Sequence, residues 1–227
     1  MKDFFINIIK LLLSILIVLF LEEYFFKILA LVGIHLVKNN IVILIIYLIE
    51  LFLIYLIYGS EIGSAFSKYQ NKLGSNFLYT IIAFIVLFIS MMITNYIVKA
   101  VAQSMQISYR GLSFVNIFNS KFDFDLIVIF VKNIIVIPFV KVSIFVLGIN
   151  NLIKGKSGIF FSGLIYALYE AFLIGGNFGN VFISVIPDFV LFIILSYVYR
   201  KNGNIAFSIM TYILYLLFAG LLVTKFM

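Results

Sequence analysis

The chain contains no cysteine and no tryptophan, and its 227 residues include one histidine and two prolines. Without cysteine it has no disulfide, no thiolate nucleophile and no metal site built on cysteine ligands. A single histidine also excludes a site with several histidine ligands. We therefore expect neither a metal nor another cofactor.

Charged residues are also scarce. Only 11% of the residues are charged, whereas 65% are hydrophobic, and the mean hydropathy is +1.24. A soluble domain is typically about 45–50% apolar and about 25% charged. The composition therefore predicts an all-α polytopic membrane protein, folded as a single transmembrane domain over residues 1–227, with the lipid bilayer as a partner.

Polar segments divide the chain into eight apolar runs. We expect the runs to be helical, because lipid offers no partner to an unpaired backbone group. Seven are long enough to cross a hydrocarbon core of about 30 Å, whereas Phe25–Val37 is short and is expected to span, to re-enter or to lie in the interface. The sequence thus predicts a bundle of about eight (seven to eight) transmembrane helices. The runs are Phe4–Phe20, Phe25–Val37, Ile41–Tyr58, Phe77–Val98, Leu126–Leu147, Ile159–Ile174, Val181–Tyr199 and Ile205–Phe226.

The connections between these runs carry most of the 16 basic residues, scattered singly along the chain, and the net charge is +7. Loop lysines that face anionic lipid explain this excess, so no nucleic-acid partner is expected. The connections Gly59–Asn76, Gly148–Gly158 and Arg200–Asn204 are predicted to lie on one side, which the positive-inside rule makes cytoplasmic. The richness in Phe, Ile, Leu, Asn and Lys is typical of an AT-rich bacterial genome, so we expect a multi-pass protein of the bacterial plasma membrane.

Five ionisable residues fall inside the predicted spans. A charge at the bilayer centre costs at least a few kcal/mol, so each of them is a candidate for function. The alternative interpretation is that each pairs with a neighbour and fixes the positions of the helices. These residues are Glu50, Lys132, Lys141, Glu170 and Asp188.

Three standard intramembrane hydrolase chemistries lack their residues. A serine protease of the rhomboid kind needs a histidine base, and the second half of the chain has no histidine. An aspartyl protease needs two facing aspartates, and only Asp188 lies in a span. Zinc hydrolysis needs about three protein ligands. We therefore predict no catalytic residues of these types.

Three segments nevertheless occur in a recognisable order: Pro138–Leu147, Phe161–Glu170 and Tyr199–Leu216. Together they resemble the CPBP family, also called Abi or CAAX-protease-like, which contains intramembrane glutamate proteases and their bacteriocin-immunity relatives. The frame matches at Pro138, Phe145, Tyr166 and the turn over residues 202–205. The resemblance implies N-terminal helices over residues 1–125 and a CPBP/Abi-like core over residues 126–227.

The positions of the family's active site carry other residues. Lys141 and Val142 stand where the family has two glutamates, and Val146 stands in place of its arginine. The resemblance therefore implies an inactive homologue, a pseudoprotease, with Lys141 and Glu170 facing each other as a charge-reversed pair. The remaining three positions are Glu170 for the first histidine, Tyr212 for the second histidine and Leu216 for the asparagine.

The family resemblance implies a non-catalytic bacterial membrane protein that acts by binding, with self-immunity to a membrane-active peptide bacteriocin as the first hypothesis. A second hypothesis is a scaffold or chaperone subunit for another membrane or cell-wall enzyme. A third is a small transporter or permease component, in which Glu50, Glu170 and Asp188 would line the path. A protease with an unrecognised arrangement is the fourth. The partners expected beside lipid are a membrane-active peptide or another membrane protein.

Overall fold

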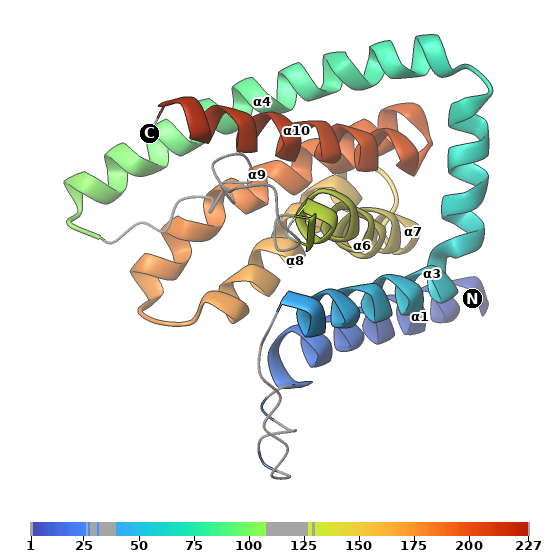
Figure 1. Cartoon of the computed structure of the whole chain (residues 1–227), viewed down its shortest axis with the longest axis horizontal. Coiled ribbons are helices and arrows are strands. Elements are labelled where there is room, and N and C mark those ends of the chain that lie inside the picture. The colour runs from blue at the N-terminus through green and yellow to red at the C-terminus, as the bar shows by residue number, and fades with distance from the viewer. Residues whose placement is uncertain are drawn as a thin grey trace.

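The computed structural model describes residues 2–25, 27, 31, 40–107, 127, 128 and 130–226, and these residues form helices and turns without a β-strand (Figure 1). Five of the described helices are long and apolar enough to cross a membrane. A polytopic helical membrane protein is therefore supported, while the count of seven to eight spans stays a prediction. The predicted run Phe25–Val37 lies largely outside the described residues.

The described elements follow one another with short turns in the second half of the chain. A π-helical turn, η1 (Phe20–Tyr24), extends the first helix, α1 (Lys2–Leu19). The remaining elements are α3 (Asn40–Gln70), α4 (Leu73–Ser104), η2 (Val131–Val136), α6 (Ile137–Val142), η3 (Ser143–Gly148), α7 (Ile149–Leu152), α8 (Lys156–Ile174), α9 (Phe178–Asn202) and α10 (Ile205–Phe226).

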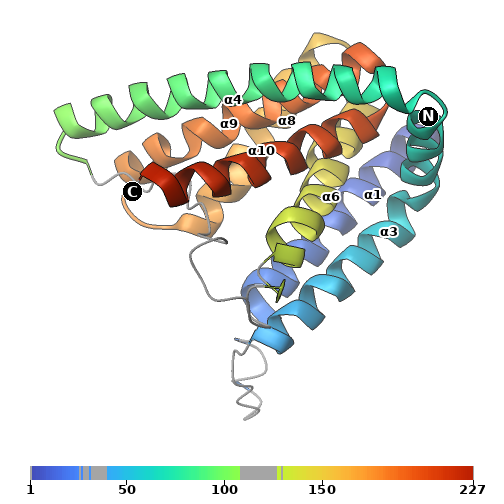
Figure 2. The ribbon, with the colours of Figure 1, turned by 45° about the horizontal axis from the view of Figure 1, so that its top comes forward.

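The elements η2, α6, η3 and α7 form one continuous rod, Val131–Leu152, which we call the central helix. In its most apolar window 78% of the residues are buried, against 22% in α3 and 17% in α4. Figures 1 and 2 show α1 and α3 side by side along one flank of the central helix, whereas α4 lies over α9 and α10. A helix that is buried on all faces is the core of a bundle.

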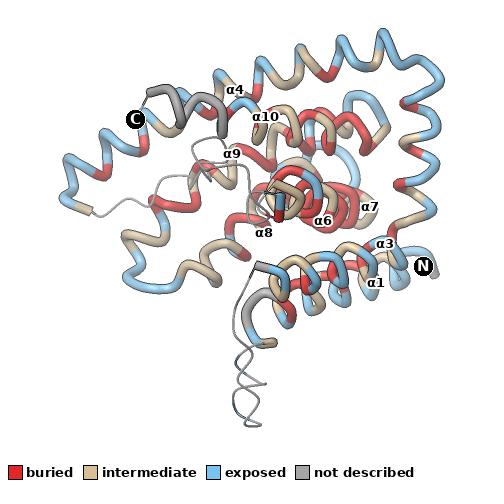
Figure 3. Tube along the Cα trace, viewed as in Figure 1, coloured by how far each residue is buried: buried red, intermediate tan, exposed pale blue. Residues whose placement is uncertain are grey.

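Many residues of the outer helices are exposed (Figure 3), and a large share of them are apolar. Exposed large residues recur along α1, α3 and α4, for example Ile9, Phe52 and Ile85. Contiguous apolar surfaces of this extent are rare on proteins that face water. Lipid tails, by contrast, are as apolar as leucine, so such surfaces suit a bilayer.

The predicted connection Gly59–Asn76 is wrong over most of its length, because α3 continues to Gln70 and α4 begins at Leu73. Two glycines within residues 59–70 suggested a loop, but a glycine lowers helix stability by only about 1 kcal/mol, and no proline follows to stop the helix. Figure 1 shows α3 bending in its second half, so that its last turns run across the ends of the other helices. We call residues 59–70 the strap.

Contacts between distant segments gather three turns at one end of the bundle. Asn204 Nδ2 donates to the Ala65 carbonyl at 2.9 Å, which joins the α9–α10 turn to the strap. Arg200 Nη2 donates to the Ile153 carbonyl at 2.7 Å, which joins the end of α9 to the α7–α8 turn. The predicted basic connections therefore meet at one end, which we call the basic end.

Candidate functional site

Helix α6 carries Lys141 into the middle of the bundle. Its side chain is 4% exposed, and Nζ donates to the Tyr169 hydroxyl of α8 at 2.8 Å. The same ammonium lies 4.1 Å from the centre of the Tyr169 ring. Lys141 precedes the end of the central helix at Leu152 by eleven residues (152 − 141 = 11), which corresponds to about 16 Å at 1.5 Å per residue. Lys141 therefore lies well inside the central helix and away from its end at Leu152.

The helix that carries Lys141 is irregular on both sides. The π-helical segments η2 and η3 flank α6, and Pro138 opens it. Proline has no N–H and clashes with the preceding turn, so a regular α-helical hydrogen-bond pattern cannot continue through residue 138. Ser143 Oγ donates to the Phe139 carbonyl at 2.5 Å, which supplies a partner in this distorted stretch. Single π-helical turns inside helices occur frequently at functional sites.

Aromatic rings from four helices gather around this position. The Phe145 ring lies 5.1 Å from Tyr169, and Tyr166 stacks on Phe192 with ring centres 3.6 Å apart. Phe192 in turn meets Tyr212 of α10 edge to face at 6.1 Å. A cation over an aromatic face is stabilised by roughly 0.5–2 kcal/mol, more when water is excluded. The Tyr169 ring therefore makes a favourable environment for the Lys141 ammonium, and the other rings pack around Tyr169 and its neighbours.

Two carboxylates border the same region. Asp188 of α9 interacts electrostatically with Glu170 and Lys141, and Tyr212 interacts with all three. Glu170 and Asp188 are partly exposed, unlike Lys141. The structure thus brings Lys141, Glu170, Asp188 and Tyr212 together from four helices. Because the hydrogen bond of Lys141 goes to Tyr169, its predicted pairing with Glu170 stays a prediction.

The other family-site positions contribute only packing. Val142 and Val146 are completely buried in the core of the bundle. Leu216 is partly buried and packs against the same core. None of these three side chains has a group that could bind a proton, a metal or a polar ligand.

Glu50 and Lys132 occupy a separate place, where α3 contacts η2. Glu50 is 1% exposed, and Lys132 Nζ lies 4.5 Å from the centre of the Tyr47 ring. Tyr47 and Glu50 are three residues apart and therefore share a face of α3. Lys132 precedes Lys141 by nine residues (141 − 132 = 9), or about 14 Å of helix. The structure therefore divides the predicted ionisable residues into two groups.

A polar network that the sequence pattern does not predict joins α7, α8 and α9. Asn150 Nδ2 donates to Ser162 Oγ at 3.0 Å and to Ser196 Oγ at 2.7 Å. Arg200 Nε donates to Asn150 Oδ1 at 2.6 Å, and its Nη2 donates to the carbonyls of Asn150 and Ile153. Arg200 thereby supplies partners to carbonyls at the end of the central helix, which would otherwise lack them.

Asn150 was missed because the connection Gly148–Gly158 was predicted to be a loop. That boundary is wrong, because the central helix continues to Leu152 and Asn150 is 3% exposed. Ile149 and Leu152, the apolar residues on either side of Asn150 and Asn151, indicate that the helix continues through this segment.

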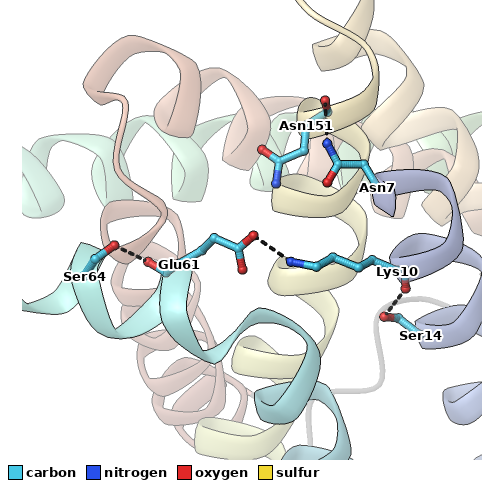
Figure 4. A network of polar contacts seen from close by, with 6 residues as sticks. All are labelled: Asn7, Lys10, Ser14, Glu61, Ser64 and Asn151. Carbon is cyan, nitrogen blue, oxygen red and sulfur yellow. Dashed lines mark hydrogen bonds and ion pairs between the residues drawn. The ribbon is translucent and has the colours of Figure 1, made fainter. Parts of the chain in front are cut away.

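A second polar network joins α1 to the strap (Figure 4). Lys10 Nζ pairs with Glu61 Oε1 at 3.0 Å, and the two side chains are 29% and 33% exposed. Ser14 Oγ donates to the Lys10 carbonyl at 2.6 Å. Ion pairs this exposed contribute about 0–1 kcal/mol, so the network aligns the strap more than it stabilises the fold.

No protein family, no curated protein and no solved structure gives a significant match to this chain. The CPBP resemblance therefore rests on the sequence frame alone.

The chemistry available around Lys141 is that of a held positive charge beside two carboxylates and several tyrosine hydroxyls. Within the described ranges, no group of three or more His, Cys, Asp or Glu side chains could hold a metal ion. A protonated lysine that already donates to a hydroxyl cannot take a proton from water, so it cannot serve as a general base in this state. The arrangement can bind a negatively charged group or fix the positions of the helices.

Proposed function

We propose that this chain is a non-catalytic CPBP/Abi-like protein of the bacterial plasma membrane that acts by binding. One observation supports this most directly: a buried lysine bonded to Tyr169 stands where the family frame requires water-activating glutamates. Tyrosine hydroxyls are weak bases at neutral pH and do not replace those glutamates.

The proposed ligand is a membrane-active peptide bacteriocin, so that the protein confers self-immunity. Immunity follows from the family resemblance, and the broad apolar outer faces of α3 and α4, which a peptide within the bilayer would meet, support it. Binding there requires no catalytic group. It requires that the helices hold their relative positions.

A growth assay tests this proposal. The chain is expressed in a bacterium that is sensitive to a panel of membrane-active peptides, and the inhibitory concentration of each peptide is compared with the empty vector. We expect about a tenfold rise for at least one peptide class, equivalent to about 1.4 kcal/mol. No rise for any peptide, with the protein present in the membrane fraction, would overturn the proposal.

A double variant, Glu170→Gln with Asp188→Asn, separates binding from hidden catalysis. Binding by outer helix faces predicts that protection persists, because the backbone and shapes are unchanged. A protease that uses these carboxylates predicts that protection is lost at unchanged protein level. The variants must therefore be compared at equal abundance, measured by immunoblotting.

Transport is the second candidate, and it too has an observation in its favour. The central helix is interrupted by η2 and η3 on either side of the buried Lys141, and transporters have broken helices that flank a binding site at the midplane. Vesicles containing the purified chain and a pH-sensitive dye would show proton flux under an imposed membrane potential. Flux that disappears in Asp188→Asn favours transport, and flux equal to that of protein-free vesicles excludes proton movement. The scaffold hypothesis stays a prediction from the sequence.

A further inference from the structure

The length of α3 determines where the strap lies. Residues 41–58 contribute 18 residues, or about 27 Å of helix, which nearly fills a hydrocarbon core of about 30 Å. The twelve residues of the strap (59–70) therefore extend beyond the core at the basic end. Figures 1 and 2 show them turning across the ends of the helices instead of continuing along the axis of α3.

The strap has an apolar face and a polar face. Ile62, Ala65 and Tyr69 are buried against the bundle at 6%, 7% and 3% exposure. The opposite face exposes small polar residues and a lysine: Ser60, Gly63, Ser64, Ser67 and Lys68. Such a helix at a membrane boundary lies in the interface, with its polar face toward headgroups and water.

Specific contacts hold the strap in this position. The Tyr69 hydroxyl is 2.8 Å from Thr80 Oγ1 of α4, and the Tyr69 ring meets Phe207 of α10 at 5.0 Å. Phe66 stacks on Phe139 of α6 with ring centres 5.5 Å apart. The polar face is thus presented outward by a fixed part of the fold.

Five lysines of the strap and of the neighbouring turns lie at the basic end. All five are exposed, and within the part of the chain that the structure describes none pairs with a carboxylate. Arg200 differs from them, because its guanidinium is committed to the Asn150 and Ile153 carbonyls. The five are Lys68 within the strap, Lys72 just after it, Lys154 and Lys156 at the α7–α8 turn, and Lys201 at the end of α9.

The two ends of the bundle differ in charge. At the basic end the described acidic residues are Asp3 and Glu61, and Glu61 is already paired with Lys10. At the opposite end the described basic residues are Lys27 and Lys99. Unpaired positive charge is therefore concentrated beside the strap, where it complements a negatively charged surface.

We propose that the strap and the five exposed lysines form a binding surface for the headgroups of anionic phospholipids. Each lysine near an anionic leaflet contributes attraction, and the serine hydroxyls of the strap can donate hydrogen bonds to phosphate oxygens. This surface places the basic end in the more anionic, cytoplasmic leaflet. The inference concerns lipid and orientation and does not depend on the proposed function.

Lipid preference tests the surface directly. Because the chain has no cysteine, Ser67→Cys introduces a single thiol that can carry a fluorescent donor on the strap. The labelled full chain is placed in phosphatidylcholine vesicles that contain acceptor-labelled phosphatidylglycerol or acceptor-labelled phosphatidylcholine. We expect about threefold stronger energy transfer to phosphatidylglycerol.

Matched double variants identify the residues responsible. Lys154→Gln with Lys156→Gln should remove most of the preference, whereas Lys27→Gln with Lys99→Gln, at the opposite end, should leave it unchanged. Equal losses in the two doubles would show an effect of net charge alone and would overturn the proposal. Preference retained after replacement of all five lysines would overturn it as well. Elution of each variant as a single species by size exclusion confirms that it has folded.

Thiol accessibility tests the position of the strap. Ser60→Cys and Ser67→Cys should react with a membrane-impermeant maleimide, whereas Ile49→Cys, on the exposed apolar face of α3, should not. Reaction only in inverted vesicles would place the strap on the cytoplasmic side, as proposed. Protection of both strap positions, or reaction only in right-side-out vesicles, would overturn this placement.

Discussion

Replacing Tyr169 with phenylalanine tests the central contact of the candidate site. The change removes the hydroxyl that accepts from Lys141 Nζ at 2.8 Å and keeps the ring beneath the ammonium. Water does not readily replace the lost acceptor, because Lys141 is 4% exposed. A hydrogen bond from a charged donor contributes roughly 1.5–3 kcal/mol, so we expect Tyr169→Phe to lower the free energy of unfolding by about 2–3 kcal/mol.

A double-mutant cycle isolates the contact. The free energy of unfolding is measured by circular dichroism during titration with SDS in mixed micelles, for both single variants and for Lys141→Met with Tyr169→Phe. The expected coupling energy is about 1.5–3 kcal/mol. Tyr197→Phe serves as the control: Tyr197 is 54% exposed, so its replacement should change stability by less than about 0.5 kcal/mol. A coupling energy below about 0.5 kcal/mol would refute the argument that this hydrogen bond fixes α6 against α8.

Three further changes follow from the geometry. Asn150→Ala should lower the free energy of unfolding by about 3 kcal/mol, because it removes the partner of two buried serines and of Arg200; the same titration measures it. Gly148→Ala should lower the free energy of unfolding by about 1–3 kcal/mol, because the new Cβ would lie 2.6 Å from the Tyr58 hydroxyl of α3. Gly63→Ala, whose new Cβ would have no atom within 4 Å, should be neutral or stabilising in thermal denaturation. Asp188→Asn should leave stability within about 1 kcal/mol of the parent chain, since within the described residues Asp188 has electrostatic neighbours but no hydrogen bond; a larger loss would show that its charge is firmly paired.

Hydropathy was sufficient to place the later helices. The predicted run Ile205–Phe226 coincides with α10, and Ile159–Ile174 differs from α8 only by three residues at its start. Long apolar runs give this accuracy because a span must satisfy its own backbone and therefore has one available form.

Features that depend on tertiary contacts were not predictable in this way. The strap has the serine and glycine content of a loop, and only its packing against α6, α4 and α10 shows why it is helical. Similarly, Asn150 is polar, and its three partners lie on α8 and α9, far away in the sequence. The π-helical segments around Lys141 also change which faces of the central helix meet its neighbours, so regular helical spacing could not identify Tyr169 as the partner of Lys141.

The charges inside the bundle bear on the choice between binding and transport. Asp188 interacts electrostatically with both Lys141 and Glu170, so full ionisation of all three groups would leave one negative charge in excess inside the bundle. An uncompensated charge inside a bilayer is costly, so a proton or another cation bound at one of the two carboxylates would compensate it. A transporter must exchange that cation during each cycle, whereas a protein that binds through its outer faces can keep it permanently. Two measurements therefore distinguish transport from binding. Loss of proton flux in vesicles that contain Asp188→Asn favours transport. Retained peptide protection by the double variant, Glu170→Gln with Asp188→Asn, favours binding.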